Sequence, residues 1–188
     1  MKKGKVINLS GASSVGKDEI KKMLLEDSDL KLMESVSMTT RPQKDDEIDG
    51  KDYYFIDFRV FADAIKNKEL LEYTEFNGYY YGTPRAQVEF LVNAGKNVLI
   101  EVTAEGVGPL KLNIPDALAI FIVPESLEEL EKHILDVYGD DLNVNTRINK
   151  ARMEMEIAPL FKHQFSNADL NECFSGIKKL ILEKLAEE

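Results

Sequence analysis

The sequence predicts an α/β fold in which helices flank a central parallel sheet. Three short stretches, 6–9, 97–102 and 117–123, are rich in apolar residues, and the last of them is apolar without interruption. Runs of this kind are typical of strands that are buried on both faces of a sheet. Amphipathic stretches alternate with these strands, and this alternation indicates a parallel sheet covered by helices on both sides.

Helices are predicted where apolar residues recur at three- and four-residue spacing. A strand at 6–9 leads into a glycine-containing loop, and the first helix follows the loop directly. Ser126, with Glu129 three residues later, has the pattern of a capping box and marks the start of a helix after the strand at 117–123. The helical spacing occurs in the stretches 20–24, 88–92, 127–134 and 177–185.

The alternation of strands and helices breaks twice. Residues 35–82 are rich in Tyr, Asp and Glu and alternate in polarity, which favours an inserted antiparallel subdomain. A polar stretch at 136–145 lies between two predicted helices and indicates a short mobile lid. We therefore expect a single domain over residues 1–188, with a core made of 1–34, 83–135 and 146–188.

Charge and composition narrow the class of function. The formal net charge is −10 and the isoelectric point is near 4.8, which argues against a nucleic-acid-binding surface because such a surface is basic. No apolar run approaches the roughly 18–20 residues of a membrane span, and residues 1–5 lead into a strand rather than a signal peptide. We therefore expect a cytoplasmic protein with no nucleic-acid or membrane partner. The single cysteine, Cys173, agrees with a reducing compartment and is expected to be a packed thiol.

Residues 11–17 have the spacing G-x-x-x-x-G-K of a phosphate-binding loop, between a predicted strand and a predicted helix. Small residues let such a loop turn its backbone amides toward phosphate oxygens, and the helix N-terminus adds a favourable dipole. Lys17 is then expected to reach the outer phosphates. An ordinary glycine-rich turn is the alternative, and the strand–loop–helix context disfavours it. The predicted phosphate-binding residues are Gly11, Ala12, Ser13, Ser14, Val15, Gly16 and Lys17.

The residue after Lys17 departs from the full motif. A Ser or Thr hydroxyl ordinarily binds magnesium there, whereas this chain has Asp18 followed by Glu19. Two like charges about 4 Å apart repel by roughly 4 kcal/mol at an effective dielectric constant of about 20, unless a metal ion lies between them. Asp18 therefore either binds magnesium directly or weakens nucleotide binding, and the sequence leaves both open.

Later segments carry side chains that suit a second anion site. Residues 35–44 hold a guanidinium and an ammonium group, and 47–55 and 78–84 hold several tyrosine hydroxyls. Glu72 is a candidate to accept hydrogen bonds from the edge of a base. Taken singly, either kind of segment would also fit a solvated β-hairpin.

Taken together, and in this order after the phosphate loop, these segments closely resemble guanylate kinases. The resemblance rests on the patterns TTR…E-x-D-G-x-D-Y-Y-F and LLEY…YYYGTP, and it runs over nearly the whole chain. It implies the P-loop NTPase fold, with a GMP-binding subdomain at 35–82 and a lid at 136–145. It also implies a nucleoside monophosphate kinase that converts ATP and GMP to ADP and GDP with Mg²⁺, as a monomer or homodimer.

The resemblance gives each matching acceptor-side residue a role. Arg41 and Lys44 match the two cations that grip the phosphate of GMP, although the family usually has arginine at the second position. Tyr53 and Tyr81 match the tyrosines that hydrogen-bond the same phosphate. The family's guanine-reading positions match Ser37, Glu72, Thr83 and Thr103. The family usually has a carboxylate where this chain has Thr103, and a neutral hydroxyl there weakens discrimination between guanine and other bases.

The resemblance also assigns the donor side and the metal. It implies that Lys17, Arg41 and Arg147 serve phosphoryl transfer. Asn167 matches an asparagine close to the adenine of ATP, and Asp18 adjoins the ATP phosphates. The candidate magnesium ligands are Asp18 and Glu101, which matches an acidic family position near the metal and the phosphates.

The chain departs from the family mainly in the lid. The family carries R-L-x-x-R-G, whereas residues 133–139 contain neither arginine; Arg147 retains a family arginine and Arg152 is a candidate stand-in. Ser14 also replaces the family's usual glycine in the phosphate loop. Two alternatives therefore stay open: a catalytically inactive guanylate-kinase-like binding module, and a kinase for a different nucleoside monophosphate, which Thr103 suggests.

Overall fold

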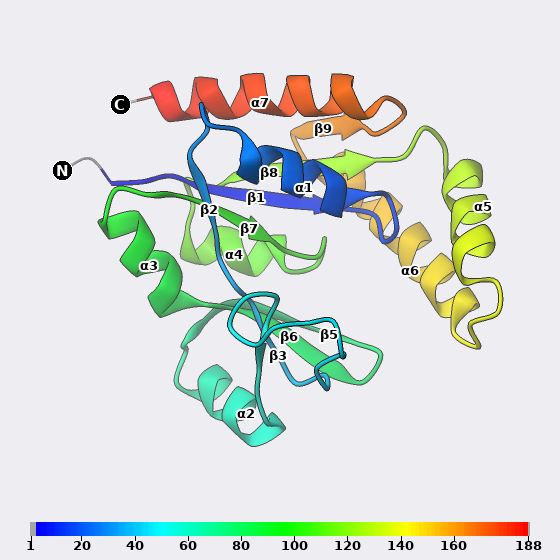
Figure 1. The fold of residues 1–188 in the computed structure, drawn as a ribbon, viewed down its shortest axis with the longest axis horizontal. Coiled ribbons are helices and arrows are strands. Elements are labelled where there is room, and N and C mark those ends of the chain that lie inside the picture. The colour runs from blue at the N-terminus through cyan, green and yellow to red at the C-terminus, as the bar shows by residue number, and fades with distance from the viewer. Residues whose placement is uncertain (1–2, 188) are drawn as a thin grey trace. The chain divides into compact units, whose positions relative to one another are not determined.

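The predicted alternation of strands and helices is present in the computed structural model, which describes residues 3–187 (Figure 1). The chain divides into two units. The hairpin unit contains Leu32–Ala117 together with the described residues up to Val6, and the loop unit contains Ile7–Lys31 together with the described residues from Leu118 onward. The single-domain organisation stays a prediction.

A parallel sheet of β1 (Val6–Gly11), β8 (Leu118–Val123) and β9 (His163–Ser166) organises the loop unit. In its register Leu9 of β1 lies opposite Ile120 of β8. Neither side chain has exposed surface, and every residue of β1 is buried. The two apolar strands predicted for this unit are therefore confirmed, and β1 leads into the loop that precedes the first helix.

Two helices of the loop unit, α1 (Lys17–Glu26) and α7 (Leu170–Ala186), lie side by side (Figure 1). Asp169 caps α7, because its carboxylate accepts hydrogen bonds from the amides of Asn171 and Glu172. Burial raises the pKa of the Cys173 thiol to about 11, in agreement with a packed side chain. The buried residues of the two helices are Ile20, Leu24, Cys173, Ile177 and Ile181.

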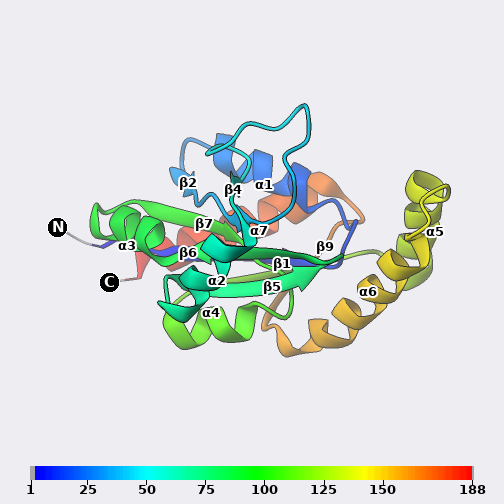
Figure 2. The ribbon, with the colours of Figure 1, turned by 90° about the horizontal axis from the view of Figure 1, so that it is seen from below.

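The other two long helices of this unit, α5 (Leu127–Tyr138) and α6 (Val144–Ile157), also lie side by side (Figure 2). The connection between them, residues 139–143, is shorter than the predicted lid at 136–145, because the polar residues at both ends of that stretch belong to helices. A short 3-10 helix, η1 (Ala158–Leu160), follows α6. None of the helices within residues 3–187 is long and apolar enough to cross a membrane.

The helix α5 begins where the sequence predicts. The hydroxyl of Ser126 accepts a hydrogen bond from the amide of Glu129 at 3.1 Å, which satisfies one of the open amides of the first turn. The buried face of the helix carries Leu130 and Ile134 at helical spacing.

The hairpin unit contains a parallel pair of strands, β2 (Leu32–Glu34) and β7 (Asn97–Glu101). The helix α3 (Arg85–Asn93) contacts β7, and α4 (Val107–Asn113) contacts a strand of the second sheet, β5. The parallel pairing and the buried centre of β7 confirm the strand predicted at 97–102.

A second sheet in this unit has the strand order β4-β3-β6-β5. Its two long strands form a hairpin, and the turn residues Asn77 and Gly78 both have left-handed backbone, at φ 52° and 79°. Such a turn matches the twist of the strands, which explains the Asn-Gly pair. The strands are β3 (Met38–Thr39), β4 (Tyr54–Phe55), β5 (Leu70–Phe76) and β6 (Tyr79–Pro84).

The inserted subdomain predicted at 35–82 differs from the prediction in two respects. The strands β3 and β4 pair in parallel, so the sheet is mixed rather than wholly antiparallel. The subdomain also contains a helix, α2 (Phe58–Lys66), which packs Phe61 and Ala64 against Leu70 of β5. This apolar contact forms the core of the sheet and requires a helix where the prediction had only strands.

Candidate functional site

The loop at residues 11–17 joins β1 directly to α1. Ser14 and Gly16 have left-handed backbone, with φ of 65° and 86°, and the amide of Val15 between them donates to the carbonyl of Ala12 at 3.2 Å. Turns of this kind direct neighbouring amides into a concave surface that binds anions. The N-terminus of α1 begins at the end of the loop and adds its dipole. The loop therefore has the backbone geometry that its spacing predicts.

Two glycines of this loop lie close to neighbouring atoms, one to backbone and one to a side chain. A Cβ at Gly11 would lie 2.8 Å from the carbonyl oxygen of Ile122, and one at Gly16 would lie 2.7 Å from Nδ2 of Asn167. Ser14 lacks the freedom of a glycine, and left-handed backbone costs a residue with a Cβ roughly 1–2 kcal/mol. The surrounding contacts must therefore hold Ser14 in place.

Two side chains hold the loop on either side of Ser14. The amide and the hydroxyl of Ser13 both donate to Oε2 of Glu154, at 2.6 and 2.7 Å. The side-chain amide of Asn167 donates to the carbonyl of Val15 at 2.7 Å. Asn167, expected near adenine, thus contacts the loop backbone, and its Oδ1 is buried without a hydrogen-bond partner among the described residues.

The contact with Glu154 was not predicted from the sequence. The spacing in the sequence could have indicated it, because Glu154 lies on the same face of α6 as Ile148 and Ala151, and this face is buried. A carboxylate at an apolar position of an amphipathic helix requires a polar partner in the fold.

Lys17 lies over the first part of the loop. Its ammonium donates to the carbonyl oxygens of Gly11 and Ala12, at 3.3 and 3.2 Å. These hydrogen bonds place a positive charge beside the loop, where the outer phosphates of a nucleotide are expected.

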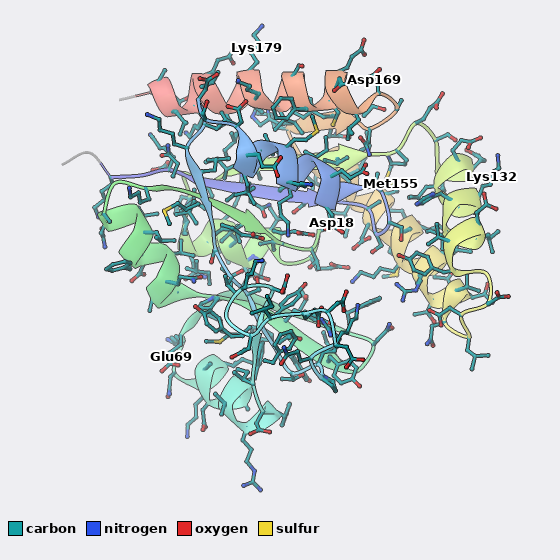
Figure 3. All side chains as sticks on the ribbon, viewed as in Figure 1. Asp18, Glu69, Lys132, Met155, Asp169 and Lys179 are labelled. Atoms are coloured by element: carbon teal, nitrogen blue, oxygen red, sulfur yellow. The ribbon has the colours of Figure 1, made fainter. Side chains whose placement is uncertain are left out.

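Asp18 and Glu19 occupy the first turn of α1, and Figure 3 shows Asp18 at the end of this helix next to the loop. Their charges are favourable near a helix N-terminus. Within residues 3–187 no three His, Cys, Asp or Glu side chains are grouped to hold a metal ion. Magnesium requires only one or two carboxylates when phosphate oxygens and waters complete its shell, so Asp18 fits such an ion. Glu101, the last residue of β7 in the hairpin unit, stays a predicted ligand.

Arg147, the retained family arginine, lies on the first turn of α6 and contacts the α5–α6 connection. Its Nε donates to Asp141 at 3.1 Å, and its guanidinium lies 4.4 Å from the centre of the Tyr138 ring. The pKa of Asp141 is lowered by the amide of Asn143 and by Arg147. Arg147 is thus held at the connection between α5 and α6.

Arg152, the candidate stand-in for a lid arginine, has a different role. Its Nε and Nη2 donate to the two carboxylate oxygens of Glu131, at 2.6 and 2.8 Å. This bidentate pair joins α6 to α5, so the structure assigns Arg152 to helix packing.

On the hairpin unit, Arg41 is paired with Glu47. Its Nη1 and Nη2 donate to the two carboxylate oxygens at 2.9 and 2.7 Å, and Nη1 also donates to the carbonyl of Pro42. The Arg41 guanidinium lowers the pKa of Glu47 to about 2. Three of the five guanidinium hydrogens are used in this way, and the guanidinium also interacts with the Tyr81 side chain, so that Glu47 and Tyr81 together raise the pKa of Arg41. The Nε and Nη2 edge has the geometry that suits a bidentate phosphate contact. Glu47 was not predicted as a site residue, although it lies in the motif.

The predicted phosphate-binding tyrosines lie beside Arg41. The guanidinium lies 5.5 Å from the centre of the Tyr53 ring, and Tyr53 makes an edge contact with Tyr81 at 5.9 Å between centres. The backbone amide of Lys44 donates a hydrogen bond to Oε2 of Glu47 at 2.9 Å, so Lys44 belongs to the same loop. The structure therefore gathers the four residues predicted to hold one phosphate.

Two of the residues predicted to read a base form a buried pair. The hydroxyl of Thr83 on β6 donates to Oε1 of Glu72 on β5 at 2.6 Å, and Glu72 is 6% exposed. Burial raises the pKa of Glu72 to about 7, and the hydrogen bonds from Thr83 oppose this shift. When ionised, this carboxylate only accepts hydrogen bonds, so a ligand edge that meets it would need N–H or O–H donors.

The other predicted base-reading residues lie near the ends of strands. Thr103 follows β7, and its hydroxyl is buried without a partner among the described residues. Its carbonyl accepts from the amide of Gly106, where an added Cβ would lie 2.6 Å from Oε2 of Glu72. The same Cβ would lie 2.5 Å from Cγ1 of Val102, so the absence of a side chain at Gly106 lets the Glu72 carboxylate pack against this turn. Ser37 directly precedes β3, and its carbonyl accepts from the amide of Tyr54.

Comparisons with known proteins agree on one family. The guanylate kinase family model matches residues 3–184. A guanylate kinase from Mycoplasma mobile is 38% identical over 100% of this chain and 96% of its own length. One from Mesoplasma florum is also 38% identical, and the chain spans 63% of its length. Among solved structures, guanylate kinase from Anaplasma phagocytophilum matches with a TM-score of 0.79 and 26% identity, over 100% of this chain and 89% of that one.

Proposed function

Because this chain belongs to the guanylate kinase family, we propose that it transfers a phosphoryl group from ATP to GMP and forms ADP and GDP. The family predicted from the motifs is confirmed by the match over residues 3–184, and the predicted α/β P-loop fold by the solved relative. The enzyme class, nucleoside monophosphate kinase, follows from the same relatives.

The buried pair of Glu72 and Thr83 is the observation that carries the choice of acceptor. Guanine presents N–H donors on the edge that a carboxylate at the base of a pocket would meet, whereas adenine presents an acceptor at the corresponding ring nitrogen. A site built to accept hydrogen bonds rejects a base without those donors, because its buried acceptor would lose its partner.

We propose that the acceptor phosphate binds the Nε and Nη2 edge of Arg41, beside Tyr81. Glu47 and Pro42 hold the other hydrogens of the guanidinium, so its plane is fixed before the substrate arrives. The tyrosine hydroxyls of Tyr53 and Tyr81 would complete the contact. Holding the phosphate in one orientation lowers the barrier, since phosphoryl transfer depends mainly on alignment and charge stabilisation.

We assign the donor phosphates to the loop at residues 11–17. Lys17 already lies against this loop and would move its hydrogen bonds from the backbone carbonyls to phosphate oxygens. Mg²⁺, held through Asp18 and the phosphates, would neutralise phosphate charge when bound. Arg147 would move from Asp141 to the transferring group, where an arginine contributes about 10³–10⁵ in rate in related P-loop enzymes.

Thr103 favours one alternative, a kinase for another nucleoside monophosphate. Its buried hydroxyl can either donate or accept a hydrogen bond, whereas a carboxylate only accepts. A base with a different pattern of donors could therefore meet Thr103 while still using Glu72.

A substrate panel tests the proposal. ADP formation is measured in a coupled assay with ATP, Mg²⁺ and one acceptor at a time: GMP, IMP, AMP or UMP. We expect turnover with GMP, and weaker turnover with IMP because hypoxanthine lacks the exocyclic amine. A faster reaction with any other acceptor would favour the alternative, and no reaction with any of them at high enzyme concentration would contradict kinase activity.

A further inference from the structure

Glu154 is a buried carboxylate that takes no part in the transfer described above. Its side chain is 2% exposed, and one oxygen accepts both hydrogen bonds from Ser13 in the phosphate loop. The other oxygen lies 3.9 Å from the ammonium of Lys150, one helical turn earlier on α6. A carboxylate this deeply buried must have such partners, and here the partner with the short hydrogen bonds is the loop.

The hydrogen bonds to Glu154 hold Ser13, which is next to a residue with strained backbone. Ser13 immediately precedes Ser14, whose φ of 65° is left-handed although it carries a Cβ. Left to itself, a serine favours other backbone conformations, and these would turn the following amides away from the concave surface. Asn167 fixes the carbonyl of Val15 on the other side. The carboxylate is thus placed to control the conformation of the loop.

We propose that Glu154 is a positioning residue that holds the phosphate loop in its anion-binding conformation before a nucleotide arrives. A loop that is already ordered binds more tightly, because less conformational freedom is lost on binding. The expected effect on ATP affinity rests on the proposed function, whereas the expected effect on the loop without nucleotide does not.

The test compares Glu154→Gln with a matched control. The substitution preserves size and one acceptor oxygen but removes the charge, and hydrogen bonds to a charged acceptor are about twice as strong as neutral ones. Glu131→Gln is the control. Glu131, on α5, accepts two hydrogen bonds from Arg152, which lies on the same helix as Glu154, and both of these bonds are outside the phosphate loop. Calorimetry measures ATP and GMP binding, and amide hydrogen exchange measures protection of Ser13 without nucleotide.

We expect Glu154→Gln to raise the Kd for ATP about tenfold and to speed exchange of the Ser13 amide by a similar factor. The Kd for GMP should stay unchanged, and the control should lie within about twofold of wild type in all three measurements. Adding Ser14→Gly should reduce the loss of ATP affinity to about threefold, because glycine adopts left-handed backbone without a Cβ penalty.

Three results would overturn the proposal. One is wild-type ATP affinity and Ser13 exchange in Glu154→Gln. The second is tighter ATP binding, which would mean that the carboxylate competes with phosphate. The third is that adding Ser14→Gly to Glu154→Gln restores none of the lost ATP affinity, which would mean that Glu154 does not act through the backbone conformation of the loop.

If Glu154→Gln does not fold, Ser13→Ala replaces it, because it removes only the hydroxyl hydrogen bond. It should raise the Kd for ATP about threefold, and wild-type affinity would contradict the proposal. If wild type itself does not bind ATP, the proposed function fails. Exchange of the Ser13 amide in the Glu154→Gln and control variants then still decides whether the hydrogen bonds from Ser13 to Glu154 order the loop.

Discussion

Glu72→Gln should change stability and substrate binding in opposite directions. Glu72 is 6% exposed, and burial raises its pKa to about 7 from the ordinary 4.5, in spite of the hydrogen bonds from Thr83. The folded protein therefore holds the proton more tightly than the unfolded chain does. Stability contributed by the protonated group is present at low pH and is lost as the pH rises from 4.5 through 7.

The size of the effect follows from the separation of the two pKa values. At 1.36 kcal/mol per pH unit, the ionised carboxylate costs about 3 kcal/mol of stability at pH 8 and less than about 1 kcal/mol at pH 5. A glutamine side chain does not ionise and still offers an oxygen to the Thr83 hydroxyl. The variant should therefore be more stable than wild type by about 3 kcal/mol at pH 8 and close to wild type at pH 5. Its GMP affinity should fall about tenfold, because a charged acceptor is lost.

Urea unfolding of the nucleotide-free protein at pH 5 and pH 8 measures the stability change, and calorimetry measures GMP binding. Glu75→Gln is the matched control, because Glu75 is exposed on the same strand, and it should show no pH-dependent gain. An equal stability change at both pH values would refute the reasoning, as would a variant that is less stable at pH 8.

Three other substitutions test separate parts of the site. Gly106→Ala should lower stability by about 1–3 kcal/mol in urea unfolding and weaken GMP binding, because its Cβ would crowd Glu72; wild-type behaviour would show that the space is not needed. Glu47→Gln should raise the Kd for GMP about fivefold to tenfold by releasing Arg41, whereas tighter binding would mean that Glu47 competes with phosphate. Asp18→Ser should lower the Kd for ATP measured without Mg²⁺, because a repulsive charge is removed, and it should reduce the increase in ATP affinity that Mg²⁺ produces. If calorimetry shows that the substitution changes the Kd for ATP by the same factor with and without Mg²⁺, Asp18 does not contact the metal.

Local patterns in the sequence predicted the strands and the phosphate loop, because these depend on short-range periodicity and spacing. The helix α2 was missed, although Phe61 and Ala64 are three residues apart and Ile65 is also apolar. Residues 35–82 are rich in Tyr, Asp and Glu, and their alternating polarity favours strands, so this short helical spacing of apolar residues was overlooked. The parallel pairing of β3 with β4 was also missed, because it depends on the path of the long connection between them.

The residues of the candidate site divide in the same way. Those carried by motifs, such as Arg41 and Glu72, could be named from the sequence because their order along the chain is distinctive, and their roles stay predictions. Glu154 was missed because its partner in the loop is 141 residues away, and no local spacing reports such a contact. The carboxylate that holds Arg41, Glu47, lies in a recognised motif, but its pairing required the coordinates.

The proposed activity transfers the terminal phosphoryl group of ATP to GMP. The direct measurement is a single turnover with terminally labelled ATP, GMP and Mg²⁺ at enzyme concentrations above that of ATP, followed by separation of the nucleotides. We predict that the label appears in GDP. Label that stays in ATP, or that appears only as inorganic phosphate, would contradict it.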